Sequence, residues 1–344
     1  MITEFSTVQL TAIVDALADA ALIVSELGEV LSSNAAADAF FEARAIGQHL
    51  TFALRAPIIL QAVNQAILQA KTSRVEHTMR TPVLRTLDVQ VSPLGNLDHN
   101  TRIALIVLRD LTREQQVERM RSDFVANASH ELRTPLASLT GFIETLQGAA
   151  KNDVAAQKNF LNLMKTQADR MARLIDDLLS LSRIEITEHV QPTGTVDLVE
   201  VVRRAKDLLS IEARSAECEI RVDMAPTLKV VGEEDQLSQV VHNLIENAIK
   251  YGRAGKFIDI EGSAQNGIVS LAVRDYGPGI AAQHVPRLTE RFYRVNVQDS
   301  RTRGGTGLGL AISKHIINRH RGRLSIESVL GTGSNFSIHL PSAK

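Results

Sequence analysis

Apolar residues recur every three or four positions through the middle of the chain, which is the spacing of long amphipathic helices. After Leu111 the first stripe runs through Val117, Met120, Phe124, Ala128, Leu132, Leu136, Leu139, Ile143 and Leu146. After a break over 148–153 a second stripe follows, with Phe160, Met164, Met171, Leu174, Ile175, Leu178 and Leu181. Two long helices joined by a short loop predict an antiparallel hairpin. Because a lone hairpin cannot cover both stripes, we expect two copies to pair into a dimeric four-helix bundle.

The segments on either side of this hairpin have mixed patterns. Residues 1–110 combine helical spacing with strand-like runs at 21–24, 30–31, 87–91 and 103–108, which predicts a small α+β domain. The stretch 10–24 is apolar except for Asp15 and Asp19, so it is predicted to be an amphipathic helix and not a membrane span. Beyond Pro192 and Gly194, helical runs at 197–216 and 233–250 alternate with strands at 219–222, 258–262, 269–274, 324–328 and 335–340. We therefore predict a multidomain α+β protein with domains at 1–110, 111–188 and 189–344, the last an α/β sandwich.

Composition excludes several classes of protein. The 344 residues are 44% hydrophobic and 22% charged with a formal net charge of -1, so no basic field for direct nucleic-acid binding is expected. The single cysteine, Cys218, excludes an internal disulfide and a multi-cysteine zinc site, and it fits a reducing, cytoplasmic compartment. No secretory signal is evident, so membrane attachment is expected only through an anchor upstream of Met1.

The first long helix contains the segment Ser129-His130-Glu131-Leu132-Arg133-Thr134-Pro135. At about 100° per residue His130 lies roughly opposite the centre of the apolar stripe, so its imidazole is expected to face solvent. Glu131 can accept a hydrogen bond from one ring nitrogen and leave the other nitrogen as a nucleophile. Thr134 can hold a water or hydroxyl near the same ring, and Pro135 predicts a bend in the helix. An ordinary solvated histidine is the alternative for this position taken alone.

Polar residues in the last third of the chain suggest a nucleotide site. Asn243, Asn247 and Lys250 share one side of the helix 233–250, where amide oxygens can complete the water-rich shell of Mg²⁺ and the lysine can meet phosphate. Asp275 ends a strand, and its carboxylate can accept a hydrogen bond from the exocyclic amine of adenine. Taken singly, each feature also fits a solvated helix face or a plain turn.

Two later blocks extend this pattern. The block Arg287–Val295 alternates arginines with aromatic residues and predicts a hinged lid, with Phe292 as its hydrophobic anchor and Arg291 or Arg294 reaching phosphate. The block Gly304-Gly305-Thr306-Gly307-Leu308-Gly309 opens directly into a helix, and backbone N–H groups at a helix start attract phosphate. A dinucleotide-binding fingerprint is excluded, because that motif follows the first strand of a βαβ unit.

Taken together, the segments resemble the sensor histidine kinases of two-component systems, and most closely the phosphate-regulon sensor kinases. Residues 124–139 resemble the phospho-acceptor box, and residues 235–340 resemble the nucleotide-binding domain, of the Bergerat fold, that these kinases share with type II topoisomerases, Hsp90 chaperones and mismatch-repair ATPases. More weakly, residues 12–110 resemble a PAS-type sensory domain, from Asn34 at a helix start to the closing triplet Asp110-Leu111-Thr112.

The resemblance implies a set of site residues, cofactors and partners. It makes His130 the autophosphorylation site, Glu131 the general base, Thr134 a residue for dephosphorylating the partner, and Asn247 the Mg²⁺ ligand. The implied ATP site comprises Asn243, Asn247, Lys250, Tyr251, Asp275, Gly277, Gly279, Ile280, Phe292, Arg294, Gly305, Thr306, Gly307, Leu308 and Gly309. The implied partners are a second copy of the chain and a response-regulator receiver domain of the winged-helix class. An ATP-hydrolysing conformational clamp and a nucleotide-binding signalling scaffold are the alternatives.

Overall fold

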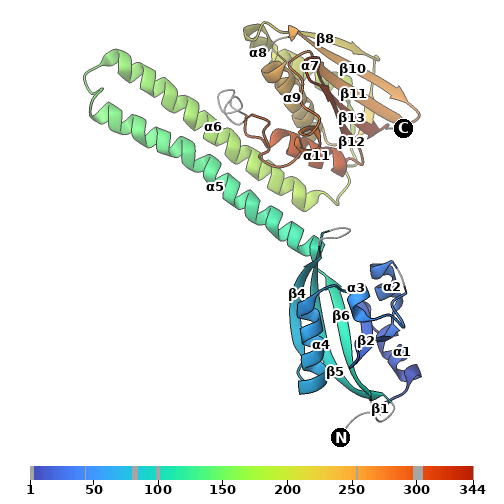
Figure 1. Cartoon of the computed structure of the whole chain (residues 1–344). Helices are drawn as coiled ribbons and strands as arrows, with labels where there is room; N and C mark the ends of the chain where they lie inside the picture. The colour runs from blue at the N-terminus through green and yellow to red at the C-terminus, as the bar shows by residue number, and fades with distance from the viewer. Residues whose placement is uncertain are drawn as a thin grey trace. The chain divides into compact units, whose positions relative to one another are not determined.

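The computed structural model describes residues 4–42, 44–79, 84–97, 101–252, 255–296 and 305–343. The chain divides into two compact units, Met1–Asp123 and Phe124–Lys344, and the division falls inside a long helix (Figure 1). Mixed helices and sheets in both units confirm the predicted α+β class. The three predicted domain boundaries remain a prediction.

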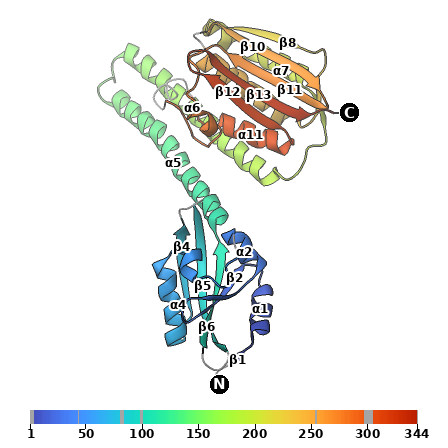
Figure 2. The same cartoon turned by 45° about the vertical axis from the view of Figure 1, so that its right-hand side comes forward.

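An antiparallel sheet with one parallel edge strand forms the centre of the first unit (Figure 2). Among the described residues its order is β1-β5-β6-β2-β3, with β4 also paired to β5. The strands are β1 (Glu4–Phe5), β2 (Ala20–Ser25), β3 (Val30–Ser33), β4 (Ser73–Met79), β5 (Arg85–Leu97) and β6 (Thr101–Asp110). The helices are α1 (Thr7–Asp15), α2 (Ala35–Phe41), α3 (Leu50–Ala53) and α4 (Pro57–Gln69). One hydrophobic core lies beneath α2 and α4, and a smaller one lies beneath α1.

The prediction of one helix over 10–24 is wrong, because α1 ends at Asp15 and β2 begins at Ala20. The side chain of Asn34 stabilises the turn between them by donating to the carbonyls of Val14, Leu17 and Asp19. The same side chain caps α2 by accepting from the backbone N–H of Ala37 at 2.9 Å. The buried side chain of Asn34 therefore has hydrogen-bond partners for both its amide nitrogen and its amide oxygen, which stabilises the turn.

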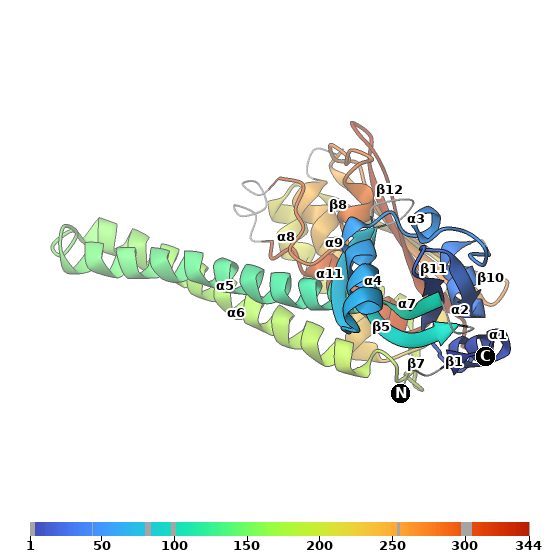
Figure 3. The same cartoon turned by 60° about the horizontal axis from the view of Figure 1, so that its bottom comes forward.

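Helices α5 (Thr112–Gln147) and α6 (Val154–Thr187) run antiparallel side by side, as the sequence predicts (Figure 3). Asp110 accepts from the backbone N–H of Thr112 at 2.9 Å and so caps the start of α5. Asp153 caps α6 in the same way through Ala156. Helix α5 continues through Pro135, and this proline is buried. None of the described helices is long and apolar enough to cross a membrane.

A second sheet, of order β12-β13-β11-β10-β8, carries the C-terminal part of the second unit (Figure 2). Its strands are β8 (Glu219–Met224), β10 (Phe257–Gln265), β11 (Ile268–Asp275), β12 (Arg323–Val329) and β13 (Gly333–Pro341). Helices α7 (Leu198–Leu208), α8 (Ser210–Ser215), α9 (Glu234–Tyr251) and α11 (Gly309–Arg319) belong to this part, as do the short pair β7 (Thr195–Asp197) and β9 (Lys229–Val231) and the turn η2 (Val285–Arg287). The predicted single helix over 197–216 is wrong, because Leu209 leaves helical geometry and separates α7 from α8.

The core of the second unit extends from this sheet into the hairpin. Leu174, Leu181 and Ile184 of α6 belong to the same buried cluster as α9, α11 and the sheet. The apolar stripe of α6 is therefore partly covered by the chain's own C-terminal part. Burial of such side chains, at about 1.5–3 kcal/mol each, holds α6 against α11.

Candidate functional site

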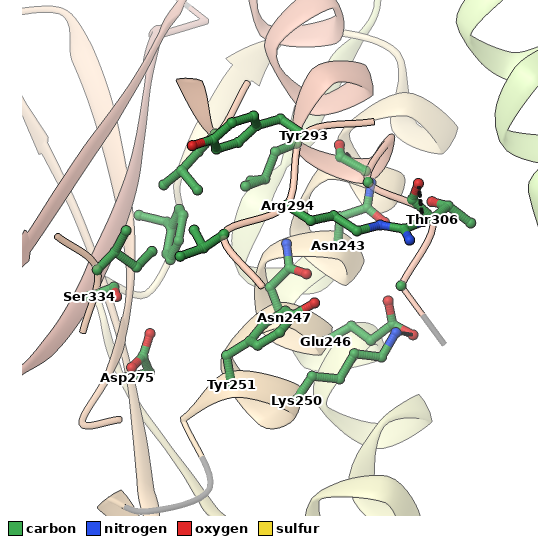
Figure 4. A pocket seen from close by; sticks show the side chains of 18 of the residues that line it. Asn243, Glu246, Asn247, Lys250, Tyr251, Asp275, Tyr293, Arg294, Thr306 and Ser334 are labelled. Carbon is green, nitrogen blue, oxygen red and sulfur yellow. Dashed lines mark hydrogen bonds and ion pairs between the residues drawn. The ribbon is translucent and has the colours of Figure 1, made fainter. Parts of the chain in front are cut away.

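A cavity of about 510 Å³ opens between α9, the end of β11, the lid residues 287–296 and the glycine loop 305–309. This volume lies within the range of about 300–1,000 Å³ typical of small-molecule sites. Helix α9 forms its floor with Asn243, Glu246, Asn247, Lys250 and Tyr251 (Figure 4). The cavity therefore gathers residues from sequence blocks that lie far apart along the chain.

At one end of the cavity lies Asp275, the last residue of β11, which is buried. One carboxylate oxygen accepts from the backbone N–H of Gly277 at 2.9 Å. Burial raises the pKa of Asp275, and hydrogen bonds from Gly277 and Ser334 oppose that rise. A buried carboxylate held by neighbouring donors presents its second oxygen in a fixed direction, which suits recognition of a ligand N–H group.

Polar side chains of α9 line the middle of the cavity. Asn243 donates to the carbonyl of Gly309 at 3.3 Å and so joins α9 to the glycine loop. Lys250 pairs with Glu246 at 2.7 Å, one turn earlier on the same helix. The amide of Asn247 points into the cavity between Asp275 and Arg294 (Figure 4). Because these residues are three or four positions apart, one side of the helix carries all of them.

Two glycines allow the close backbone contacts that shape the site. Gly307 has φ +76°, and a Cβ there would lie 3.0 Å from backbone atoms of Phe292. Its carbonyl accepts from the N–H of Phe292 at 2.8 Å, so the glycine loop and the lid are joined directly. Gly279 has φ +68°, and its Cβ would lie 2.1 Å from the carbonyl oxygen of Val329. Side chains at either position would push the loops apart.

The lid faces both the cavity and the hairpin. Phe292 packs on Phe124 of α5 with ring centroids 5.9 Å apart. Arg294 lines the cavity and donates to the carbonyl of Thr306 at 2.8 Å. Its Nε has no hydrogen-bond partner within the described structure, although the side chain is only 6% exposed. A buried N–H without a partner is costly, and a ligand anion in the cavity would satisfy it.

The phospho-acceptor segment lies on the part of α5 that approaches the lid. His130 is exposed, as the sequence predicts. Glu131 forms ion pairs at 3.1 Å with Arg294 of the lid and at 3.1 Å with Arg170 of α6. The hydroxyl of Thr134 donates to the carbonyl of His130 at 3.2 Å. The structure therefore brings the residue next to His130 into contact with a residue of the cavity wall.

Sequence reasoning missed the contribution of α6 to the cavity. Arg173, Asp176 and Asp177 line it from the hairpin side. Asp177 accepts from the hydroxyl of Thr306 at 2.7 Å, and burial raises its pKa. The only signal in the sequence is that these polar residues share the side of α6 opposite its apolar stripe. That placement fits a solvated face equally well, so only the fold identifies the contact.

The remaining predicted residues divide into two groups. Those that line the cavity are Tyr251, Gly279, Ile280, Gly305, Thr306, Gly307 and Gly309. Leu308 is instead fully buried in the core, and Gly277 acts through its backbone hydrogen bond to Asp275. Gly304, the first residue of the predicted glycine block, lies outside the described residues.

Two protein-family models match this chain, one over the helical hairpin and one over the part that contains the cavity. The family model described as "His Kinase A (phospho-acceptor) domain" matches residues 120–186. The model described as "Histidine kinase-, DNA gyrase B-, and HSP90-like ATPase" matches residues 232–344. The first match contains the helical hairpin with His130, and the second contains the cavity.

Individual proteins give the same result. The chain is 40% identical over 261 residues to the phosphate regulon sensor protein PhoR of Pseudomonas aeruginosa, a match that covers 75% of this chain and 57% of that protein. The solved structure of the Acinetobacter baumannii histidine kinase AdeS is similar at 28% identity and a TM-score of 0.51, over 62% of this chain and 98% of that one. A structure of the histidine kinase ThkA in complex with response regulator protein TrrA has the same TM-score, 0.51, at 20% identity over 96% of this chain and 98% of that one, which concerns the fold alone.

The chain spans 57% of the length of that PhoR relative. Within this span, an acceptor hairpin with an exposed histidine precedes an ATPase-type cavity whose lid contacts the hairpin. The chain therefore belongs to the sensor histidine kinases, and the phosphate-regulon sensors are among the types to which it is similar.

Proposed function

We propose that this chain uses Mg-ATP to phosphorylate its own His130 and then transfers the phosphoryl group to an aspartate of a response-regulator receiver domain. The observation that carries the proposal is the contact at 3.1 Å between Glu131, next to His130, and Arg294, which lines the cavity. A conformational clamp or a binding scaffold would have no need for an acceptor helix at the mouth of the nucleotide site.

The proposed recognition of ATP follows the length of the cavity. Asp275 accepts from the adenine amine at the buried end, and the backbone N–H groups of 305–309 and the unsatisfied Nε of Arg294 bind the phosphates at the other. Lys250 contributes positive charge from α9. Transfer of a phosphoryl group requires mainly such positioning and charge neutralisation.

The proposed chemical step balances without any further reactant. The lone pair of one imidazole nitrogen of His130 attacks the γ-phosphorus, while the bond from that phosphorus to the β–γ bridging oxygen breaks and ADP leaves with its electron pair. The proton on the other ring nitrogen passes to Glu131 as general base. Before it can accept this proton, Glu131 must be released from its ion pairs with Arg170 and Arg294. Thr134 would position the water that dephosphorylates the regulator.

The donor set of the cavity fits magnesium bound together with ATP. No group of three or more His, Cys, Asp or Glu residues that could hold a metal occurs in the part of the chain that the structure describes. Mg²⁺ keeps several waters and is commonly bound by one or two protein ligands plus phosphate oxygens, and the amide of Asn247 supplies such a ligand. When bound, the ion would neutralise charge on the phosphates.

The proposed partners follow from exposed surfaces and from family membership. Val125, Leu136 and Ile143 of α5 are 58%, 54% and 42% exposed, and a second copy forming the four-helix bundle would cover them. The receiver domain would bind near His130, and we assign it to the winged-helix class by likeness to phosphate-regulon systems. The first unit would act as a PAS-type input domain, and we place the chain in the cytoplasm, where both ATP and the regulator are available.

Incubation of the full chain with γ-labelled ATP tests the proposal. We expect label that is stable in alkali and labile in acid, as a phosphoramidate should be, and we expect His130→Gln to abolish it. The matched control is His189→Gln, which replaces another exposed histidine beyond the end of α6 and should retain the label. Steady phosphate release without a phosphoprotein would contradict the proposal and favour the clamp. Nucleotide binding with neither label nor hydrolysis would favour the scaffold.

A further inference from the structure

The side chain of Tyr293 forms part of the cavity wall on the side of the lid. Its ring points towards the side of the cavity on which Asp275 lies, whereas the next residue, Arg294, points towards Thr306 (Figure 4). Apolar side chains that also line the cavity include Ile280, Leu288 and Phe336. Two successive lid residues therefore face different halves of the cavity.

Three contacts hold the ring of Tyr293 in place. A hydrogen bond of 2.6 Å joins Nδ1 of His284 and the hydroxyl of Tyr293. The guanidinium carbon of Arg287 lies over one face of the same ring, 4.2 Å from its centroid. The backbone N–H of Tyr293 donates to the carbonyl of Glu290 at 3.3 Å. Because its hydroxyl, one face and its backbone are all bound, the ring is held in one orientation.

The residues that hold the ring lie outside the cavity. Neither His284 nor Arg287 lines it in the part of the chain that the structure describes. The side chain of Arg287 is 55% exposed and pairs with Glu290 at 3.1 Å, so it covers the ring from the solvent side. The opposite face of Tyr293 is therefore the one turned to the cavity. Since the hydroxyl is already bound to His284, this face offers aromatic carbon to a ligand.

An aromatic face suits the nucleoside half of ATP better than its phosphates. Bases stack favourably on aromatic rings, whereas the partial negative charge of a ring face disfavours a phosphate. Phosphates require donors such as those of Arg294 and the glycine loop. We infer that Tyr293 binds the nucleoside half of the nucleotide, and that His284 is a positioning residue that fixes the Tyr293 ring from outside the cavity. The inference rests on the proposed use of ATP.

Equilibrium titration of the full chain with ATP and with ADP tests this contact. Tyr293→Phe keeps the ring but loses the hydrogen bond, and His284→Leu removes its other partner. Loss of one hydrogen bond should raise the Kd for ATP about 2- to 10-fold in either variant. Because the two nucleotides share their nucleoside, the Kd for ADP should rise by the same factor. An effect on ATP alone would show that Tyr293 serves the phosphates and would overturn the inference.

A double-mutant cycle separates positioning through Tyr293 from an independent effect of His284. If His284 acts through the tyrosine hydroxyl, the variant with both changes should bind ATP about as weakly as either single variant. Effects that multiply would overturn the inference, as would an unchanged Kd in Tyr293→Phe. His284→Asn, whose side-chain amide can take the place of Nδ1, should restore affinity close to that of the wild type.

Two further measurements distinguish positioning from a general loss of structure. The rate of His130 labelling at saturating ATP should stay within about twofold of the wild type, because a contact made equally in the ground state and the transition state changes affinity alone. A lower rate at saturating ATP with an unchanged Kd would contradict the assignment. His189→Leu, at an exposed position outside the cavity, is the matched control and should bind both nucleotides as the wild type does.

The test stays decisive if one variant is unstable. Melting temperatures check the folding of each protein, and Tyr293→Phe, which preserves the packing of the ring, decides the question if His284→Leu does not fold. Failure of the wild-type chain to bind either nucleotide would instead contradict the proposed function itself.

Discussion

Replacement of Asp275 by asparagine should reverse the cavity's preference between two purine nucleotides. One oxygen of Asp275 accepts from the N–H of Gly277 at 2.9 Å, so an asparagine carbonyl would keep that bond and turn its NH₂ group towards the cavity. The amide would then face the amine of adenine donor to donor. A hydrogen bond to a charged group contributes about 1.5–3 kcal/mol, so the Kd for ATP should rise about 10- to 150-fold.

Inosine triphosphate provides the complementary measurement, because it has a carbonyl where ATP has the amine. The asparagine variant should bind it better than the wild type does, since the amide can donate to that carbonyl. Calorimetric titration of both proteins with both nucleotides measures this change in relative affinity. Asp223→Asn is the control, because Asp223 lies on β8 outside the cavity. An unchanged ratio of the two affinities would show that Asp275 does not read the base.

Three further predictions concern stability. Burial lowers the pKa of His320 in the folded chain. The stability that its neutral ring contributes is therefore complete above about pH 6.5 and is lost as the pH falls through the lowered folded value. The melting temperature should fall in acid, and it should fall less steeply for His320→Gln. Burial raises the pKa of Asp177, so its ionisation costs stability as the pH rises through that raised value. Asp177→Asn, whose amide can still accept from Thr306, should therefore melt above the wild type at about pH 8 but not at about pH 4. Leu244 is fully buried, so Leu244→Ala should cost about 2–5 kcal/mol in urea unfolding, whereas Leu208→Ala, at a position 71% exposed, should stay within about 0.5 kcal/mol.

The sequence predicted helices and strands correctly where the local spacing of apolar residues determines them. The hairpin was found because apolar spacing persists over many turns, and the loop at 148–153 interrupts it in both sequence and structure. The strands of the second sheet were found because apolar and polar positions alternate along them. The glycine loop and Asp275 were singled out by residue type and by their places next to a helix and a strand. The helix predicted over 197–216 was wrong because a single residue, Leu209, departs from helical geometry without any glycine or proline to mark the break.

Contacts between distant segments required the tertiary structure. The sequence by itself determined that His130 faces away from the apolar stripe, because one helical period fixes the side on which each residue lies. Only the fold decided that Asp177 of α6 holds the glycine loop and that Arg294 reaches Glu131, 163 residues earlier in the chain. Such pairs leave no periodic signal in the sequence. Asp177 and Glu131, taken alone, each fit a solvated helix face, and only contact with the other segment gives them a role.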